Sequence, residues 1–173
     1  EYFEHGDIDA DTISFFDLDT SGVEFVFNLN FIGTLLPTQI FAQDMVDKEG
    51  CNILNISSMN AFTPLTKIPA YSGAKAAISN FTQWLAVHFS KAGIRVNAIA
   101  PGFFLTEQNR TLLTNPDGSY TQRGNDVIRQ TPFKRFGRPE ELCGTIQYLI
   151  SDASKFVTGT VAVVDGGFNV FAM

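Results

Sequence analysis

Tyr71 and Lys75 lie one helical turn apart in the segment Tyr-Ser-Gly-Ala-Lys. Side chains four residues apart share one helix face, so the phenol and the ammonium can approach each other. An ammonium near a phenol favours the phenolate and lowers the phenol's pKa from about 10. The pair therefore predicts a tyrosine that donates and accepts a proton near neutral pH.

Further polar and small residues follow two segments that have the pattern of buried strands. Ser58 ends the first segment, thirteen residues before Tyr71. The second segment ends at Pro101 and Gly102, and Thr106 follows four residues after the glycine. In a parallel α/β sheet, ligands bind outside the carboxyl ends of the strands. We therefore expect these residues to meet at one edge of a sheet.

The elements that must position these residues alternate along the chain. Apolar residues at helical spacing predict helices over about 20–47, 71–91 and 139–151. Short apolar runs predict strands over 52–58, 94–100 and 158–164. Pro37 predicts a kink or a break into two helices within the first of these helices. The alternation predicts an α/β fold, with a parallel sheet covered by helices on both faces.

Two segments fall outside this alternation. Residues 1–19 mix acids with scattered aromatics and predict a loop, and residues 103–133 predict a long polar excursion. The first predicted strand has no partner on its outer side. The architecture therefore looks like the second half of a larger domain.

Charge is distributed unevenly along the chain. Residues 1–47 contain ten Asp and Glu and no Lys or Arg, whereas the remainder contains eight acids and twelve bases. The simpler interpretation is a solvated acidic segment ahead of an ordinary domain. The alternative is a basic body suited to phosphates or to a carboxylate substrate. The net charge of −6 argues against a nucleic-acid partner.

Cysteine usage and hydropathy favour a cytoplasmic protein without metal or membrane. Cys51 and Cys143 have no metal-ligand spacing, so two buried thiols in a reducing compartment are expected, with no disulfide and no zinc site. No apolar run approaches the roughly 20 residues that span a bilayer. No basic and then apolar leader is present in the sequence, so secretion is not expected.

Taken together, these motifs resemble the C-terminal half of the short-chain dehydrogenase/reductase family, from about residue 24 to the end. The resemblance implies that residues 1–173 form a partial Rossmann-type domain, the second half of a doubly wound parallel sheet. It also implies an NAD- or NADP-dependent oxidoreductase that interconverts a secondary alcohol and a ketone. The family's Gly-rich pyrophosphate turn is absent from the sequence, so the chain is expected to begin after it.

The resemblance implies catalytic roles for four residues. Ser58 would hydrogen-bond the substrate carbonyl, and Tyr71 would be the general acid/base. Lys75 would tune the pKa of Tyr71 and donate to the nicotinamide ribose. Asn30, three residues before Gly33, would hold a water that passes protons to Lys75. Nearby Asn28 is a weaker match because it lacks the downstream glycine.

The resemblance also assigns Tyr71 and Lys75 to the cofactor, together with a segment that closes over the nicotinamide. The matching residues of that segment are Pro101, Gly102, Phe104 and Thr106. Structural alternatives exist for several of the assignments. Ser57 and Ser58 could satisfy strand-end backbone groups, Asn30 could lie on a helix exterior, and Thr106 could cap the next segment. His88 is expected to be a structural residue near the end of its helix.

The substrate is suggested by two stretches of sequence. Residues 58–71 and 101–110 resemble family members that interconvert a keto-uronate and an aldonate, of the mannonate oxidoreductase or fructuronate reductase type. Five polar side chains could meet hydroxyls and a carboxylate: Asn60, Lys67, Gln108, Asn109 and Arg110. Each could instead be a solvated surface residue. The excursion over 103–133 matches the family's substrate-covering loop and is expected to order on binding.

Two alternatives to a sugar-acid oxidoreductase remain. One is 3-oxoacyl reduction, or reduction of another carbonyl, by the same residues. The other is a non-catalytic fragment that acts through an oligomer interface. The predicted helix over 71–91 is apolar almost all round, so it should be buried by the sheet and by another subunit. A homodimer or homotetramer is therefore expected.

Overall fold

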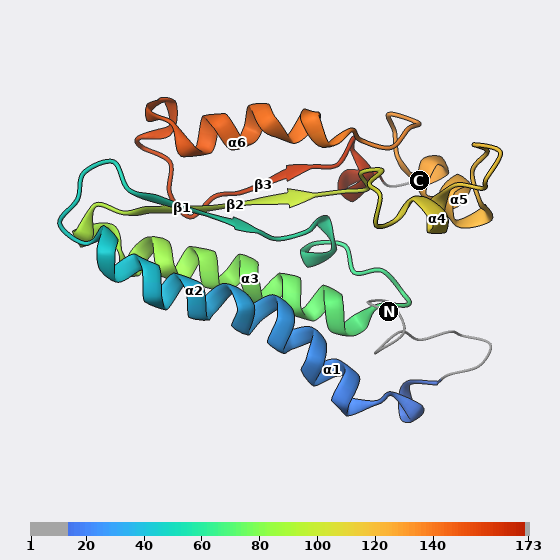
Figure 1. The fold of residues 1–173 in the computed structure, drawn as a ribbon, viewed down its shortest axis with the longest axis horizontal. Coiled ribbons are helices and arrows are strands. Elements are labelled where there is room, and N and C mark those ends of the chain that lie inside the picture. The colour runs from blue at the N-terminus through green and yellow to red at the C-terminus, as the bar shows by residue number, and fades with distance from the viewer. Residues whose placement is uncertain (1–13, 172–173) are drawn as a thin grey trace.

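The structure is a computed structural model that describes residues 14–171 (Figure 1). It contains a three-stranded parallel sheet in the order β1-β2-β3. The strands are β1 (Asn52–Ile56), β2 (Arg95–Pro101) and β3 (Val161–Val164). The middle strand is almost wholly buried, as an apolar strand between two helical layers must be. The predicted α/β fold with a parallel sheet is confirmed.

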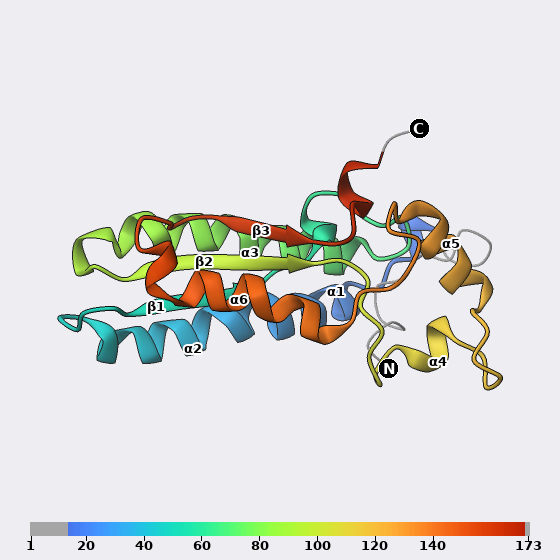
Figure 2. The ribbon, with the colours of Figure 1, turned by 90° about the horizontal axis from the view of Figure 1, so that it is seen from above.

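Helices cover both faces of the sheet (Figures 1 and 2). One layer contains α1 (Thr20–Phe27), α2 (Gly33–Phe41) and α3 (Pro69–His88), and the other contains α6 (Cys143–Ile150). Short 3-10 helices connect these elements, at Phe15–Asp17, Ala42–Met45, Met59–Ala61, Ser90–Ala92, Pro139–Leu142, Asp152–Ser154 and Phe168–Val170. Within the described residues β1 pairs only with β2, so its outer edge is open, as the sequence predicted.

The first helical segment runs without a break from Thr20 to Met45. The break predicted at Pro37 is wrong, because Pro37 lies inside α2. The irregularity lies earlier, in a π-helical turn over Asn28–Ile32, where the Gly33 amide donates to the Asn28 carbonyl. An inserted π turn of this kind is often found at functional sites.

This segment also bears on the membrane prediction. Thr20–Met45 has a mean hydropathy of 1.3 over an 18-residue window and is long and apolar enough to cross a membrane by length and composition alone. The prediction that no segment approaches this length overlooked its continuity, because Asn28, Asn30 and Thr34 interrupt the apolar residues. One such helix is weak evidence for a membrane span.

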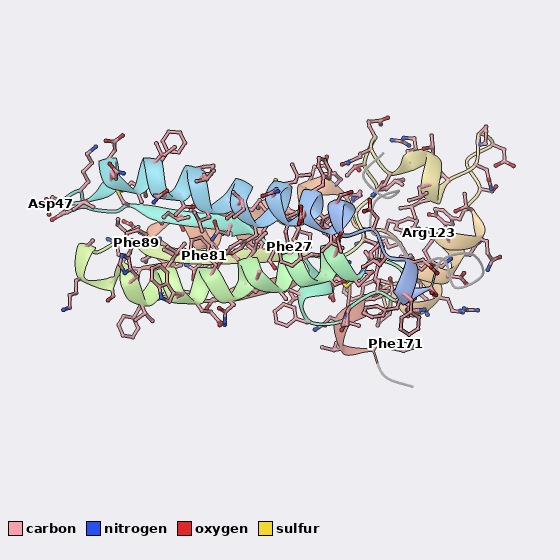
Figure 3. The ribbon with its side chains drawn as sticks, turned by 90° about the horizontal axis from the view of Figure 1, so that it is seen from below. Phe27, Asp47, Phe81, Phe89, Arg123 and Phe171 are labelled. Atoms are coloured by element: carbon pink, nitrogen blue, oxygen red, sulfur yellow. The ribbon has the colours of Figure 1, made fainter. Side chains whose placement is uncertain are left out.

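The helix that carries Tyr71 and Lys75 begins two residues earlier than predicted. Pro69 occupies its first turn, where the missing N–H leaves no hydrogen bond unmade. The helix ends at His88, and a short 3-10 turn leads to Gly93, whose φ of 71° gives the left-handed end expected there. Figure 3 shows Phe27 and Phe81 between the first helical segment and α3.

The polar excursion is folded and lies beyond the carboxyl ends of the strands (Figure 1). It contains α4 (Arg110–Leu113) and α5 (Gln122–Gln130). Leu113, Val127 and Phe136 form its own small core. The last predicted strand is shorter than expected, because Gly159 adopts a φ of 77° and interrupts the extended backbone. The part of the loop over 1–19 that precedes residue 14 lies outside the described residues.

Candidate active site

Ser58 lies just beyond the carboxyl end of β1 and starts a short 3-10 helix. Its side-chain oxygen accepts a hydrogen bond from the Asn60 amide at 3.2 Å, and its hydroxyl lies close enough to the Tyr71 phenol to lower the pKa of that phenol. The serine thus caps the turn, as the structural alternative proposed, and also contacts the tyrosine. The parallel strand and the following helix bring together two residues that are thirteen positions apart in the sequence.

Tyr71 and Lys75 occupy the first two turns of α3, on one face. The Lys75 Nζ lies 5.5 Å from the centroid of the Tyr71 ring and donates to the carbonyl of Ile56 at 3.0 Å. Lys75 is buried, and Tyr71 packs against the cluster of Val26, Ala70 and Ala74. The expected proximity of the phenol and the ammonium is therefore present.

The pKa of Tyr71 differs from the sequence-based expectation. Burial raises the pKa of the Tyr71 phenol above its usual value, and the hydrogen bond with Ser58 lowers it only in part. Burial also lowers the pKa of the Lys75 ammonium. Desolvation thus outweighs the expected effect of the ammonium. The phenol is held in its protonated form, which suits a proton donor.

Asn30 lies in the π-helical turn that packs against α3. Its side-chain amide donates to the Val26 carbonyl at 3.0 Å, and its own carbonyl accepts from the Thr34 hydroxyl at 2.8 Å. Asn30 is partly buried, so the alternative of an exterior helix position does not describe it fully. Its role in holding a water stays a prediction.

The segment after β2 is aligned against the turn that follows β3. The Gly102 amide donates to the Val164 carbonyl at 2.9 Å, and a Cβ on Gly102 would lie only 2.5 Å from the Cβ of Asp165. The Asp165 carboxylate in turn accepts from the amides of Gly167 and Asn169, at 2.8 and 2.7 Å. Only glycine fits at position 102, which explains the Pro-Gly pair there.

Phe104 and Thr106 face different surroundings. The Phe104 ring is buried against Gly137, and its contact with the cofactor stays a prediction. The Thr106 amide donates to the Asn109 side chain at 2.8 Å, and the Asn109 amide group donates to the Phe104 carbonyl at 2.8 Å. Asn109, predicted as a substrate residue, therefore shapes this loop.

The remaining predicted substrate residues do not form one cluster. Gln108 and Lys67 are exposed, and Arg110 is exposed and paired with Glu107 at 2.7 Å. For these three residues the solvated alternative fits the structure better. Asn60 is different, because it is buried beside Ser58 and its side-chain oxygen has no hydrogen-bond partner among the described residues.

One contact near the site had no sequence signal. The Thr63 hydroxyl, in the loop between Ser58 and α3, donates to the Asn169 side-chain oxygen at 2.6 Å. It joins residues 106 positions apart. His88 stacks on Trp84 at 4.6 Å between ring centroids, which agrees with the predicted structural role.

The cysteines are more accessible than predicted. Both are free thiols, with Cys51 partly buried and Cys143 exposed, so the prediction of two buried thiols is wrong. Cys143 is the first residue of α6 and lies on its outer side. The helical pattern of the sequence did not indicate that this position is exposed. Among residues 14–171, no group of His, Cys, Asp and Glu could hold a metal ion.

The site fits the nicotinamide-ribose end of a dinucleotide. Lys75 uses one of its three N–H donors on Ile56, so donors remain for ribose hydroxyls. Gly102 lets the backbone of the following loop lie close to the carboxyl ends of β2 and β3. The sequence holds no Gly-rich turn for the pyrophosphate.

Comparisons with known proteins identify the family of this chain. Residues 8–169 match the family described as enoyl-(acyl carrier protein) reductase. An uncharacterized oxidoreductase of Haemophilus influenzae is 62% identical over 171 residues, which are 98% of this chain and 60% of the relative. An uncharacterized oxidoreductase of Bacillus subtilis is 52% identical over 160 residues, 92% of this chain and 58% of the relative.

A solved structure gives the same result. A Haemophilus influenzae protein assigned provisionally as a D-mannonate oxidoreductase, with bound NAD, superposes with a TM-score of 0.88 at 61% identity. The match covers 99% of this chain and 62% of that protein. The chain thus spans about 60% of the length of the relatives it matches. It has a Rossmann-type fold, and it belongs to the short-chain dehydrogenase/reductase family.

Proposed function

We propose that this chain carries the catalytic residues of an NAD- or NADP-dependent oxidoreductase that interconverts a secondary alcohol and a ketone on a sugar acid. The observation that carries the proposal is the Lys75 Nζ 5.5 Å from the centroid of the Tyr71 ring and bonded to the Ile56 carbonyl at the end of β1, with the Ser58 hydroxyl beside the phenol. This arrangement places two hydroxyls and one ammonium at the carboxyl end of a strand, where ligands of parallel sheets bind.

The roles of the three side chains follow from their chemistry. In the direction of reduction, the Ser58 hydroxyl orients the substrate carbonyl and Tyr71 donates its proton to the carbonyl oxygen. The raised pKa of Tyr71 keeps that proton in place before the reaction. Lys75 holds the ribose and favours the phenolate that remains. A bound nicotinamide cofactor supplies the hydride, or accepts it in the reverse direction.

The sugar-acid substrate is supported by the solved relative with bound NAD, whose provisional assignment is D-mannonate oxidoreductase. Asn60 adds a side chain of suitable chemistry, because its unpartnered oxygen lies beside Ser58 and could accept from a hydroxyl after a small rearrangement. The competing substrate class is a 3-oxoacyl thioester, which carries an acyl chain and lacks the hydroxyls of a sugar acid.

A joined protein tests the proposal. This chain would be fused to the part of the Haemophilus influenzae relative that it does not match, which restores the length of the relatives. We expect NADH or NADPH oxidation with a keto-uronate, the reverse reaction with an aldonate, and much slower turnover of a 3-oxoacyl thioester. Turnover of the thioester alone would contradict the sugar-acid proposal, and turnover of neither class would contradict both.

The 173-residue chain alone should not be active. Hydride transfer needs the cofactor held in a near-attack position, and the pyrophosphate is usually gripped by a Gly-rich turn that this sequence lacks. We expect no saturable fluorescence change when the chain is titrated with NADH or NADPH. Micromolar binding by a soluble sample would show that the chain is sufficient for the cofactor.

A further inference from the structure

We propose that Ser57 is a positioning residue that holds the helical turn carrying Lys75 against the end of β1. The residue is 2% exposed and lies between β1 and Ser58. Its hydroxyl donates to the Lys75 carbonyl at 3.1 Å and lies 2.6 Å from the Ser79 hydroxyl. Its amide donates to the Ile99 carbonyl on β2 at 2.8 Å. The proposal rests on the proposed function of Lys75 and Tyr71.

The hydrogen bonds around Ser57 can all be satisfied at once. If Ser79 donates to the Ser57 oxygen, then Ser57 is free to donate its one proton to the Lys75 carbonyl. Within α3, that carbonyl normally accepts from the amide four residues later, which belongs to Ser79. Ser57 therefore gives it a second donor. Ser57 is thus hydrogen-bonded to both ends of the helical turn from Lys75 to Ser79.

Three consecutive residues contact the proposed catalytic pair through different atoms. The Ile56 carbonyl accepts from the Lys75 Nζ at 3.0 Å. Ser57 binds the main chain of Lys75, and the Ser58 hydroxyl lies beside the Tyr71 phenol. Ser57 is therefore the link that fixes Lys75 and Tyr71 in register with Ser58. Without its hydroxyl, the helix can shift relative to the strand, and both flanking contacts become weaker.

Thr82 on the same helix provides a control, because its hydroxyl also joins α3 to β1 but does not contact Lys75 or Tyr71. Thr82 is fully buried, donates to the Ile78 carbonyl at 2.9 Å and accepts from the Asn55 side chain of β1 at 2.9 Å. It also joins α3 to β1 through a buried hydroxyl, but it lies seven residues beyond Lys75. A purely structural effect of hydroxyl loss should therefore appear equally in Thr82→Val and Ser57→Ala.

The first measurement follows Tyr71 directly in the 173-residue chain. Tyrosine labelled with ¹³C at Cζ would be titrated by NMR, with Tyr71 assigned by Tyr71→Phe. We expect Ser57→Ala to raise the pKa of Tyr71 by about 0.5–1 units, because the Ser58 hydrogen bond and the ammonium both stabilise the phenolate. Ser79→Ala, which keeps the bond from Ser57 to Lys75, should give a smaller rise. Thr82→Val should leave the titration unchanged.

The second measurement uses the joined protein in the direction of alcohol oxidation. We expect Ser57→Ala to lower kcat about tenfold, a part of the 10²–10⁴-fold that acid–base catalysis supplies, with KM changed much less. In Ser57→Ala the rise of kcat with pH should move to higher pH. In Thr82→Val the dependence of kcat on pH should match that of the unmodified protein. An unshifted Ser57→Ala in either measurement, or an equal shift in Thr82→Val, would overturn the proposal.

The two measurements separate this proposal from the proposed function. A shifted Tyr71 titration in the 173-residue chain, together with a joined protein that turns over no sugar acid, would support the positioning role and contradict the substrate. Turnover of a sugar acid with an unchanged pH profile in Ser57→Ala would support the function and contradict the positioning role.

Discussion

Gly137 leaves the space in which the ring of Phe104 lies. A Cβ on Gly137 would be 2.5 Å from the Cε1 and 2.7 Å from the Cδ1 of that ring. The two residues also form a parallel bridge, in which the Gly137 amide donates to the Phe103 carbonyl and the Leu105 amide donates to the Gly137 carbonyl, at 2.9 and 3.1 Å. The loop that leads to Thr106 is therefore fixed by a residue 33 positions after Phe104.

Gly137→Ala should destabilise the protein. The added methyl group must displace the buried Phe104 ring, and overpacking of this kind costs about 1–3 kcal/mol of the free energy of unfolding. Gly144 in α6 is the matched control, because a Cβ there meets nothing within 4 Å. Gly144→Ala should stabilise by about 0.5–1 kcal/mol. Urea unfolding measures both, and a Gly137→Ala protein as stable as the unmodified one would contradict the packing argument.

The sequence was sufficient to predict how Ser58, Tyr71 and Lys75 come together. Helical spacing places the tyrosine and lysine on one face, and the parallel sheet brings the strand end to the helix. The first rule depends only on local spacing, and the second depends only on the topology of the sheet. The same rules gave a parallel sheet between two helical layers, which the structure confirms.

Features that depend on long-range packing could not be predicted in this way. The contact of Phe104 with Gly137 and the bond from Thr63 to Asn169 join segments without a shared pattern. The direction of the Tyr71 pKa shift was missed because burial, which only the folded chain defines, outweighs the nearby ammonium. Pro37 was over-interpreted, since the helix accommodates its missing N–H without ending.

Ser58→Ala should impair catalysis in the joined protein. It removes the proposed hydrogen bond to the substrate carbonyl, which we expect to raise the barrier by roughly 2–4 kcal/mol by analogy with oxyanion donors. It also removes the hydrogen bond that lowers the pKa of Tyr71, so the pH at which the phenolate forms should rise. Steady-state kinetics as a function of pH measures both effects.

Ser72→Ala is the control for this variant. Ser72 is a buried serine next to Tyr71, and its hydroxyl has no hydrogen-bond partner among the described residues. Its loss should leave kcat unchanged and slightly stabilise the fold, because an unsatisfied polar group is removed. Equal losses of activity in Ser58→Ala and Ser72→Ala would argue against a specific role for Ser58.

Glu141 should make stability depend on acid pH. Its carboxylate accepts two hydrogen bonds from Arg135 at 2.7 Å and one from the Arg138 amide at 2.9 Å, and these contacts lower its pKa from 4.5 to about 2. Because the folded pKa is depressed, this stabilisation is present above pH 4.5 and is lost as the pH falls toward 2.

Glu141→Gln tests this dependence. The Tm is measured between pH 2 and pH 6. It should fall less steeply with decreasing pH in Glu141→Gln than in the unmodified protein, since the variant has no carboxylate at this position to protonate. Glu140→Gln, at the exposed neighbouring position, should keep the original dependence. A Glu141→Gln profile that parallels the unmodified one would show that the two arginines contribute nothing at this site.

The outer face of α3 should be covered by a second copy of the protein. Trp84 and Val87 are 56% and 76% exposed in the single chain, on a helix that was expected to be buried by the sheet and by another subunit. Trp84 stacks between Phe81 and His88 and lines a groove of about 390 Å³ between α2 and α3. An apolar groove of this kind on a soluble protein marks an interaction surface.

Trp84→Glu should therefore shift a dimer or tetramer toward monomer, because the charge would be buried without a partner at a symmetric interface. Sedimentation velocity of the joined protein measures the shift, and circular dichroism checks that the fold is retained. Leu112→Glu on α4 places the same charge at a partly exposed apolar position away from the groove, and it should leave the oligomer intact. A clean monomer before any substitution, or equal dissociation by both variants, would show that α3 does not form the interface.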